Sequence, residues 1–205
     1  MRCLKYTLIL ILTVLLTGSL LHSPAQAITV TIDPVTQNVK IGDQAIVGVM
    51  IYGYAPGPPV NLAIGAYDFN IIYNPAILDF NSLYFGISLG NPANSITSHS
   101  NDSLNGILNI TETSLLLPSQ LYALQGQQWP DDWFIAATLT FNTLGKGVSP
   151  VSVDVNSLMT EMGGNFDNYY SDPGSVTVNS VPEPSTFLLL GAGFGGLAIM
   201  RRKRS

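Results

Sequence analysis

The stretch "IGAYDFNIIYN", from Ile64 to Asn74, decides the fold of this chain. In it Tyr67, Phe69 and Ile71 recur at a spacing of two residues. Side chains alternate between the two faces of a β-strand, so this period is typical of a strand with one face in a core and the other in water. The sequence therefore predicts a half-buried β-strand at this position.

Other segments on both sides of this stretch have the same strand character. They alternate apolar with polar residues or are rich in β-branched and aromatic side chains, and turns with Pro and Gly separate them. We expect strands at residues 28–33, 45–54, 64–74, 76–80, 106–113, 133–144, 150–155 and 174–180. Between the two chain ends no window has a helical stripe, although residues 114–125 leave room for a short helical turn.

Many short strands with almost no helix predict two antiparallel sheets packed face to face. The expected fold class is therefore all-β, with a single antiparallel β-sandwich, and both an immunoglobulin-like and a jelly-roll strand order remain open. We expect residues 28–180 to form one domain, because a chain of about 150 residues buries roughly 70% of its unfolded surface.

Two segments give the predicted sandwich a family resemblance. A strand with alternating aromatics runs into a Tyr-Asn-Pro turn, and about fifty residues later a strand ending in Thr-Phe leads to a Gly-containing turn. This pattern resembles the cohesin-type β-sandwich and is carried by Tyr73, Asn74, Pro75, Leu139, Thr140, Phe141, Gly145 and Gly147. The resemblance implies a fold similar to that of carbohydrate-binding modules, and a role either in holding dockerin modules or in binding sugar.

Residues 1–27 have the three-part layout of a secretory signal peptide. A basic head and an apolar run are followed by small residues at Ala25 and Ala27, which precede the expected cleavage site. The alternative, a permanent N-terminal anchor, would need a longer apolar run. Cys3 is the sole cysteine of the sequence, so after cleavage the chain must rely on packing rather than on disulfides.

Charge is unevenly distributed along the chain, whose overall net charge is -5. Between Ile28 and Val181 twelve acidic side chains stand against only two basic ones, Lys40 and Lys146. Nucleic acids are bound mainly through Lys and Arg contacts with phosphate. The composition therefore excludes nucleic acid as a partner of the sandwich and leaves neutral ligands, cations and protein surfaces.

The chain ends with a short motif, an apolar run and a basic cluster. Residues 181–184 read Val-Pro-Glu-Pro, residues 186–200 are apolar, and four basic residues follow. As a helix the apolar run would measure about 22 Å, less than the ~30 Å hydrocarbon core of a membrane. The positive-inside rule would keep the basic cluster in the cytoplasm and the acidic domain outside.

This order closely resembles the PEP-CTERM sorting tail of Gram-negative bacteria, here at residues 181–205. The resemblance assigns the sorting motif to Val181, Pro182, Glu183 and Pro184, and the membrane stop to Arg201, Arg202, Lys203 and Arg204. It implies that a C-terminal transmembrane helix holds the exported chain transiently in the inner membrane. An exosortase then cuts near the motif and passes the protein to the cell surface. A permanent single-span anchor is the alternative.

Catalytic chemistry has little support in the mature chain. Catalytic triads and zinc sites need His or Cys, and only His99 remains after Ala27, in a segment expected to be a polar loop. Asp131 and Asp132 are neighbours, and adjacent residues of a strand point to opposite faces, so they do not flank a sugar as a glycosidase requires. We expect a non-catalytic protein, with a glycosidase as the alternative.

Residues in and beside the predicted loops are candidates for ligand binding. Flat aromatic rings can pack on neutral sugars, and the candidates here are Trp129, Tyr122, Tyr169 and Tyr170. Alternatively, Trp133 is a core residue that the other aromatics partly cover. The turn-rich loop at 163–175 offers oxygen ligands for Ca²⁺ at Asn165, Asp167 and Asp172, with a plain loop as the alternative, and no other cofactor is expected.

Together these features predict an exported, surface-sorted, non-catalytic module of the extracellular polysaccharide matrix. Its partners would be an exosortase, the inner membrane transiently, and either a polysaccharide or a matrix protein. An exposed strip of coplanar aromatics near Trp129 and Tyr169 would favour sugar binding. A flat sheet face with an apolar patch rimmed by polar residues would favour cohesin-type protein docking.

Overall fold

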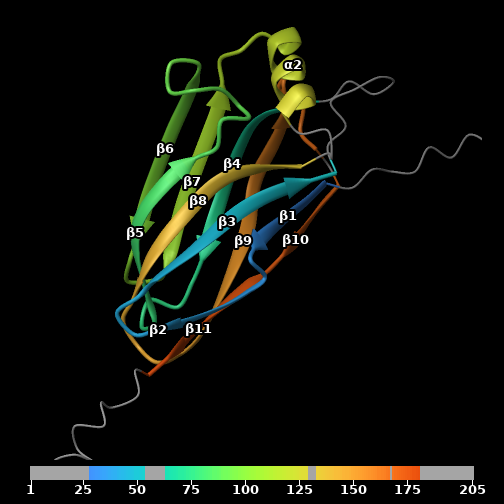
Figure 1. The fold of residues 1–205 in the computed structure, drawn as a ribbon. Coiled ribbons are helices and arrows are strands. Elements are labelled where there is room, and N and C mark those ends of the chain that lie inside the picture. The colour runs from blue at the N-terminus through green and yellow to red at the C-terminus, as the bar shows by residue number, and fades with distance from the viewer. Residues whose placement is uncertain (1–27, 54–62, 129–132, 167, 181–205) are drawn as a thin grey trace, which may run out of the picture.

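The computed structural model describes residues 28–53, 63–128, 133–166 and 168–180. Within these ranges eleven strands and one helix form a sandwich of two sheets (Figure 1). The elements are β1 Ile28–Asp33, β2 Thr36–Lys40, β3 Gln44–Tyr52, β4 Ile64–Ile72, β5 Leu78–Phe85, β6 Ser95–Asp102, β7 Ile107–Ser114, α2 Pro118–Gln128, β8 Trp133–Thr143, β9 Gly147–Thr160, β10 Tyr169–Asp172 and β11 Gly174–Asn179.

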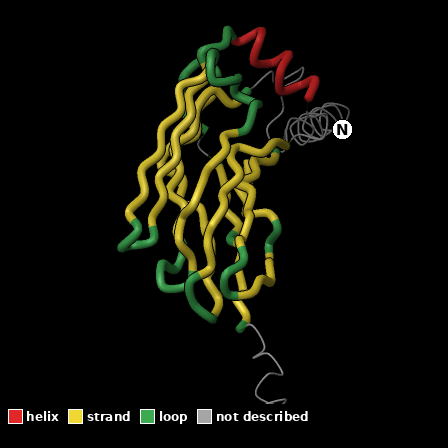
Figure 2. Tube along the Cα trace, turned by 60° about the vertical axis from the view of Figure 1, so that its left-hand side comes forward, coloured by secondary structure: helices red, strands yellow, loops and turns green. Residues whose placement is uncertain are grey.

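The two sheets have five and six strands. The five-stranded sheet has the order β10-β1-β3-β8-β5, and the six-stranded sheet has the order β2-β11-β9-β4-β7-β6. Figure 2 shows the two layers turned toward their edges, with α2 at one end of the sandwich. The predicted all-β sandwich is confirmed. Its sheets are antiparallel except that β1 pairs with β10, and β2 with β11, in parallel.

The core lies between the sheets and follows the predicted two-residue period. Tyr67, Phe69 and Ile71 of β4 are buried, and Phe134 and Phe141 of β8 are buried opposite them in the other sheet. The rings of Tyr67 and Phe69 stack with their centroids 4.7 Å apart. The half-buried strand predicted from the alternation is therefore present, as β4.

Most of the predicted strands are present with shifted ends, but three strands were missed. β1 has its predicted bounds, whereas β9 extends well beyond the predicted residues 150–155. The missed strands are β2, β6 and β10, and the prediction of a polar loop around His99 was wrong because this residue lies in β6. β6 and β10 are edge strands that are exposed almost throughout, so their sequences have no hydrophobic period to detect.

A buried amide is one of the contacts that attach helix α2 to the sandwich. The side chain of Gln125 accepts a hydrogen bond from the backbone N–H of Ile64 at 3.1 Å and donates to the backbone oxygen of Ile64 at 2.8 Å. It also donates to the backbone oxygen of Ser88 at 3.2 Å. Because the amide pairs with both backbone groups of Ile64, it takes the place of a neighbouring strand at the start of β4.

A buried carboxyl group lies beside a contact that joins the two sheets. The Tyr67 hydroxyl is 2.9 Å from Glu112 Oε2 and 2.9 Å from the backbone oxygen of Ala136, which belongs to the other sheet. The hydroxyl has one hydrogen and can donate to only one of these oxygens. A protonated Glu112 satisfies both contacts, since it donates to Tyr67 while Tyr67 donates to Ala136.

The environment of Glu112 favours this neutral form. Burial raises the pKa of Glu112 from 4.5 to about 7, and the hydrogen bonds with Tyr67 and Ser95 oppose that rise only in part. A folded-state pKa above the unfolded value means that folding takes up a proton between these two pH values. The stabilisation is therefore complete below pH 4.5 and is lost as the pH rises through about 7.

We predict that the free energy of unfolding falls between pH 5 and pH 8 by about 2 kcal/mol, once solvent screening is allowed for. Urea denaturation at the two pH values measures this fall. The Glu112→Gln variant should lose it, because a neutral amide can donate to Tyr67 at any pH. The control is Glu161→Gln, at the rim of the sandwich, which should keep the fall. An equal fall in Glu112→Gln would show that another group is responsible.

Candidate functional site

The outer face of strands β9, β4, β7 and β6 is a candidate binding surface. Asp68 and Asn70 alternate with buried residues of β4 and so point outward. The strand register places Asn109 of β7 and Asp154 of β9 on either side of Asn70. Among the described elements no helix or strand covers this face, which lies on the far side of the six-stranded sheet from the core.

Four side chains on this face form a closed ring of hydrogen bonds, the amide ring: Asp68, Asn70, Asn109 and Asn156. Asn109 Nδ2 donates to Asp68 Oδ1 at 2.6 Å and to Asn70 Oδ1 at 3.0 Å. Asn70 Nδ2 donates to Asn156 Oδ1 at 3.2 Å, and Asn156 Nδ2 donates back to Asp68 Oδ1 at 3.0 Å. The ring joins β4, β7 and β9.

The amide ring provides preorganised polar groups on an acidic surface. Mutual hydrogen bonds hold its side chains in place, so these side chains lose less conformational entropy when a partner binds. The carboxylates of Asp154 and Asp102 lie on the same face. The side chain of Asn105 donates to Asp102 and, with backbone N–H groups, lowers the pKa of that carboxyl. This surface therefore suits a partner with hydrogen-bond donors or positive charge.

This polar centre differs from the apolar patch with a polar rim that we expected of a docking face. Exposed apolar side chains lie around it instead, with Ile72 40% and Ile96 60% exposed. A signal for the ring was present in the sequence, because Asn and Asp are depleted in strands. Their position between the core residues of the predicted strand at 64–74 marks Asp68 and Asn70 as outward residues with a role other than strand formation.

Tyr122, a predicted sugar-binding residue, lies on α2 and has a partner within the protein. Its hydroxyl donates to Glu161 Oε1, while Glu161 Oε2 accepts from the backbone N–H of Ala63. The hydrogen bond to Glu161 is the main reason why the pKa of Tyr122 rises to about 12. This contact fixes α2 to the end of β9.

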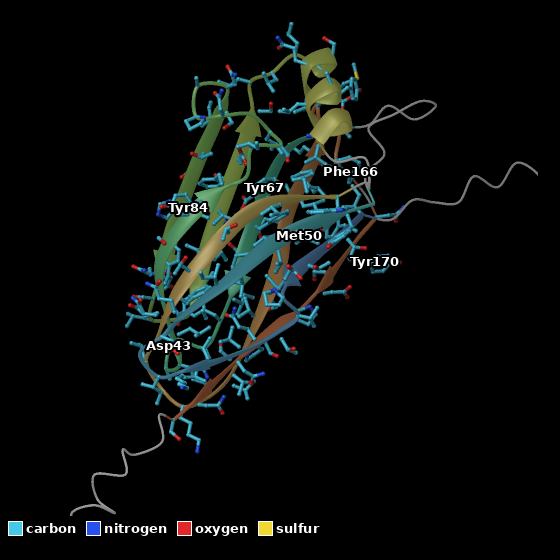
Figure 3. The ribbon with its side chains drawn as sticks, viewed as in Figure 1. Asp43, Met50, Tyr67, Tyr84, Phe166 and Tyr170 are labelled. Carbon is cyan, nitrogen blue, oxygen red and sulfur yellow. The ribbon has the colours of Figure 1, made fainter. Side chains whose placement is uncertain are left out.

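Tyr169 and Tyr170, also predicted to bind sugar, are neighbours in β10 and point in opposite directions. Tyr169 lines a surface cavity of about 270 Å³ with Phe166, Asn165 and residues 156–158, and its hydroxyl donates to the backbone oxygen of Val155 at 3.3 Å. Tyr170 is 66% exposed and lies on the outer face of the five-stranded sheet (Figure 3). The structure therefore does not bring Tyr122, Tyr169 and Tyr170 together.

Trp129 lies outside the described residues, and Trp133 does not belong to the core. Trp133 is half-buried at the start of β8 and points away from the side that carries the core residue Phe134. Its ring stacks on that of Tyr52, with centroids 6.1 Å apart and 29° between the ring planes. The alternative interpretation of Trp133 as a core residue was therefore wrong, since its side chain lies on the outer face of the sheet.

The candidate calcium ligands are only partly described. Asn165 is exposed and pairs with Met159 in an isolated bridge, Asp172 ends β10, and Asp167 lies outside the described residues. Within the described ranges no three His, Cys, Asp or Glu side chains gather as metal ligands. Calcium binding by Asn165, Asp167 and Asp172 stays a prediction.

Of the groups considered for catalysis, His99 is the one that lies among the described residues. His99 lies on β6, and its ring meets the edge of Phe80 at a centroid distance of 5.9 Å. Asp131 and Asp132 lie outside the described residues, as do the signal peptide with Ala25 and Ala27 and the tail from Val181 to Ser205. In the part of the chain that is described, no helix is long and apolar enough to cross a membrane.

Comparison with known proteins identifies the tail and the fold. Residues 180–204 match the PEP-CTERM protein-sorting motif. No curated protein matches the chain. The seventh ScaB type I cohesin of Pseudobacteroides cellulosolvens superposes with a TM-score of 0.56 at 20% identity, covering 77% of this chain and 96% of the cohesin.

Two further cohesins show how widely this fold is shared. The OlpA cohesin of Clostridium thermocellum was solved in a type I cohesin–dockerin complex. It superposes with a TM-score of 0.59 at 16% identity, and the match covers 75% of this chain and 99% of the cohesin chain. A non-cellulosomal cohesin of the archaeon Archaeoglobus fulgidus has a TM-score of 0.53 at 10% identity over 78% and 96% of the two chains. This chain therefore combines a β-sandwich of the cohesin fold with a PEP-CTERM protein-sorting motif at residues 180–204.

Proposed function

We propose that this protein is an exported, surface-sorted, non-catalytic module that docks a protein partner on the face carrying the amide ring. The observation that carries the proposal is the closed ring of Asp68, Asn70, Asn109 and Asn156 on an open sheet face. Hydrogen bonds across an interface give specificity when their donors and acceptors are held in fixed positions. A ring that spans three strands meets this condition.

The comparison structures support a partner of the dockerin type. A cohesin with the same fold as this chain was solved bound to a dockerin. The carboxylates of Asp68, Asp102 and Asp154 favour a partner surface with Arg, Lys or free backbone N–H groups. The only basic side chains of the described residues are Lys40 and Lys146, at the end of β2 and just before β9. The attraction between these exposed carboxylates and a basic partner would weaken as salt is added, because salt screens surface charges.

The sorting motif supports the proposed route to this location. An exosortase would recognise the segment from Val181 to Pro184, and the basic cluster at 201–204 would stop transfer through the inner membrane. Cleavage near the motif would then release the sandwich to the cell surface. Within the extracellular matrix the sandwich would hold its partner at that surface.

We predict that a photo-reactive amino acid at Thr111, beside the amide ring, forms a discrete protein adduct in the native host. The same group at Thr138, on the outer face of the other sheet, should not form it. Asp68→Ala should lower the adduct yield about tenfold, because the ring then loses the carboxylate that two amides share. Gel mobility and mass spectrometry of the adducts measure the outcome.

The control for Asp68→Ala is Asp79→Ala, which removes a carboxylate from β5 in the opposite sheet. This variant should leave the yield unchanged. Adducts of the same size from positions 111 and 138, or equal yields with and without Asp68, would contradict docking on this face.

We predict that replacing Pro182, Glu183 and Pro184 together by Ala leaves the chain in the inner membrane with its basic cluster intact. Membrane fractionation and mass spectrometry of the C-terminal peptide measure this, and Ser185→Ala should be processed normally. Proline disfavours a helix, so we expect replacement of both prolines to make the cleavage site less accessible as well. If the surface-exposed wild-type protein retains residues 201–204, the tail is a permanent anchor instead.

A further inference from the structure

A row of aromatic side chains crosses four strands on the outer face of the five-stranded sheet. Tyr170 of β10 pairs with Thr29 of β1, Thr29 pairs with Tyr52 of β3, and Tyr52 pairs with Trp133 of β8. These residues thus lie side by side in one line perpendicular to the strands. We propose that the aromatic row, Tyr170, Tyr52 and Trp133, binds a linear neutral polysaccharide.

The burial of the neighbouring residues shows that the row faces outward. Ile28 and Ile51 are buried in the core next to Thr29 and Tyr52, and Phe134 is buried next to Trp133. Since side chains alternate along each strand, the members of the row point away from the core. Tyr52 is 36% exposed and Tyr170 is 66% exposed, so their rings present surface to solvent.

The rings form two apolar contact points along the row, the stacked pair of Tyr52 and Trp133 and the separate ring of Tyr170. Tyr52 and Trp133 lie with their centroids 6.1 Å apart and only 29° between their planes. Tyr170 is two strands away from Tyr52, a separation of about 10 Å. The C–H faces of pyranose rings pack on aromatic faces, and this row is longer than a single pyranose. A chain of several sugars laid across the strands would therefore contact Tyr170 and the Tyr52–Trp133 pair.

Polar groups flank the row where sugar hydroxyls would lie. The next register line holds Asp172, Thr31, Met50 and Ile135. Met50 is only 6% exposed although it lies on the outer face, so its side chain is covered and offers little surface to a ligand. The carboxylate of Asp172 and the hydroxyl of Thr31 can bond sugar hydroxyls. Sugars that carry carboxylates would be repelled by Asp172, which selects for neutral chains.

The narrow shape of the row favours a polysaccharide over a protein. A stable protein interface covers about 800 Å² on each partner and has a broad core, whereas this row is one side chain wide. Tyr170 is also not needed for core packing, because most of its surface is exposed. The row lies on the opposite side of the sandwich from the amide ring, so the two surfaces can be occupied independently. The inference therefore goes beyond the proposed docking function.

The test is co-sedimentation of the full-length chain with three insoluble neutral polysaccharides: microcrystalline cellulose, curdlan and the precipitated neutral exopolysaccharide of its own host. A polyoxyethylene detergent keeps the chain in solution. A maltoside is avoided because its head group would itself be a sugar ligand. We expect retention on at least one of the three, and weaker retention on alginate gel. Tyr170→Ala and Tyr52→Ala should each lower the retained fraction roughly tenfold.

Tyr84 provides a matched control. It is 73% exposed on the same face of the same sheet but lies in β5, outside the row (Figure 3). Tyr84→Ala should bind as the wild type does, and Tyr170→Trp should retain binding because it keeps a flat ring. Tyr170 is exposed, so its variants test the row even if Tyr52→Ala does not fold.

Four results would overturn the inference. They are no retention on any of the three neutral polysaccharides, retention that Tyr170→Ala leaves unchanged, an equal loss in Tyr84→Ala, and stronger retention on alginate. Docking is read out separately, because Tyr170→Ala should not change the adduct formed from position 111, and Asp68→Ala should not change sedimentation.

Discussion

The packing of two sheets around one apolar layer is the constraint on which the rest of this structure depends. The described chain contains no cysteine, so no disulfide can join the sheets there. Core packing and the hydroxyl of Tyr67, which reaches from β4 to the backbone of Ala136 in β8, hold them together. Every strand in the middle of a sheet must therefore contribute alternate side chains to this layer. A substitution that shifts the pairing register of a strand by one residue would expose the whole set of core side chains on that strand.

The same constraint determines where binding residues can lie. Because Tyr67, Phe69 and Ile71 must point inward, the positions of β4 that are open to selection for binding are the outward ones between and beside them. Asp68 and Asn70 occupy two of these positions and complete a ring with side chains of β7 and β9. On the other sheet the inward Ile51 and Phe134 leave Tyr52 and Trp133 on the outside. Each sheet thus uses one face for stability and leaves the other open for the recognition that we propose.

The division of each strand into inward and outward residues explains which strands could be predicted from the sequence and which could not. β1 and β4 were predictable because their inward residues produce a two-residue period. β6 and β10 lie at sheet edges and are exposed almost throughout, so their sequences resemble loops. The candidate sites were harder to predict, because they depend on register between distant strands. Asp68 and Asn109 are 41 residues apart, and nothing local to either residue indicates that they meet. The sorting motif was predictable because its residues are contiguous.

The last strand of the sandwich ends away from both candidate binding surfaces. β11 ends at Asn179 at the end of the sandwich opposite α2, and the sorting motif begins directly after it (Figure 1). Asn179 at this end belongs to neither the amide ring nor the aromatic row, since both lie on the flanks of the molecule. Attachment to the last core strand also places any pulling force on β11, which is bonded to β9 and β2 on both sides. Such a strand resists detachment better than an edge strand would, and this suits the proposed role of holding a partner at a surface.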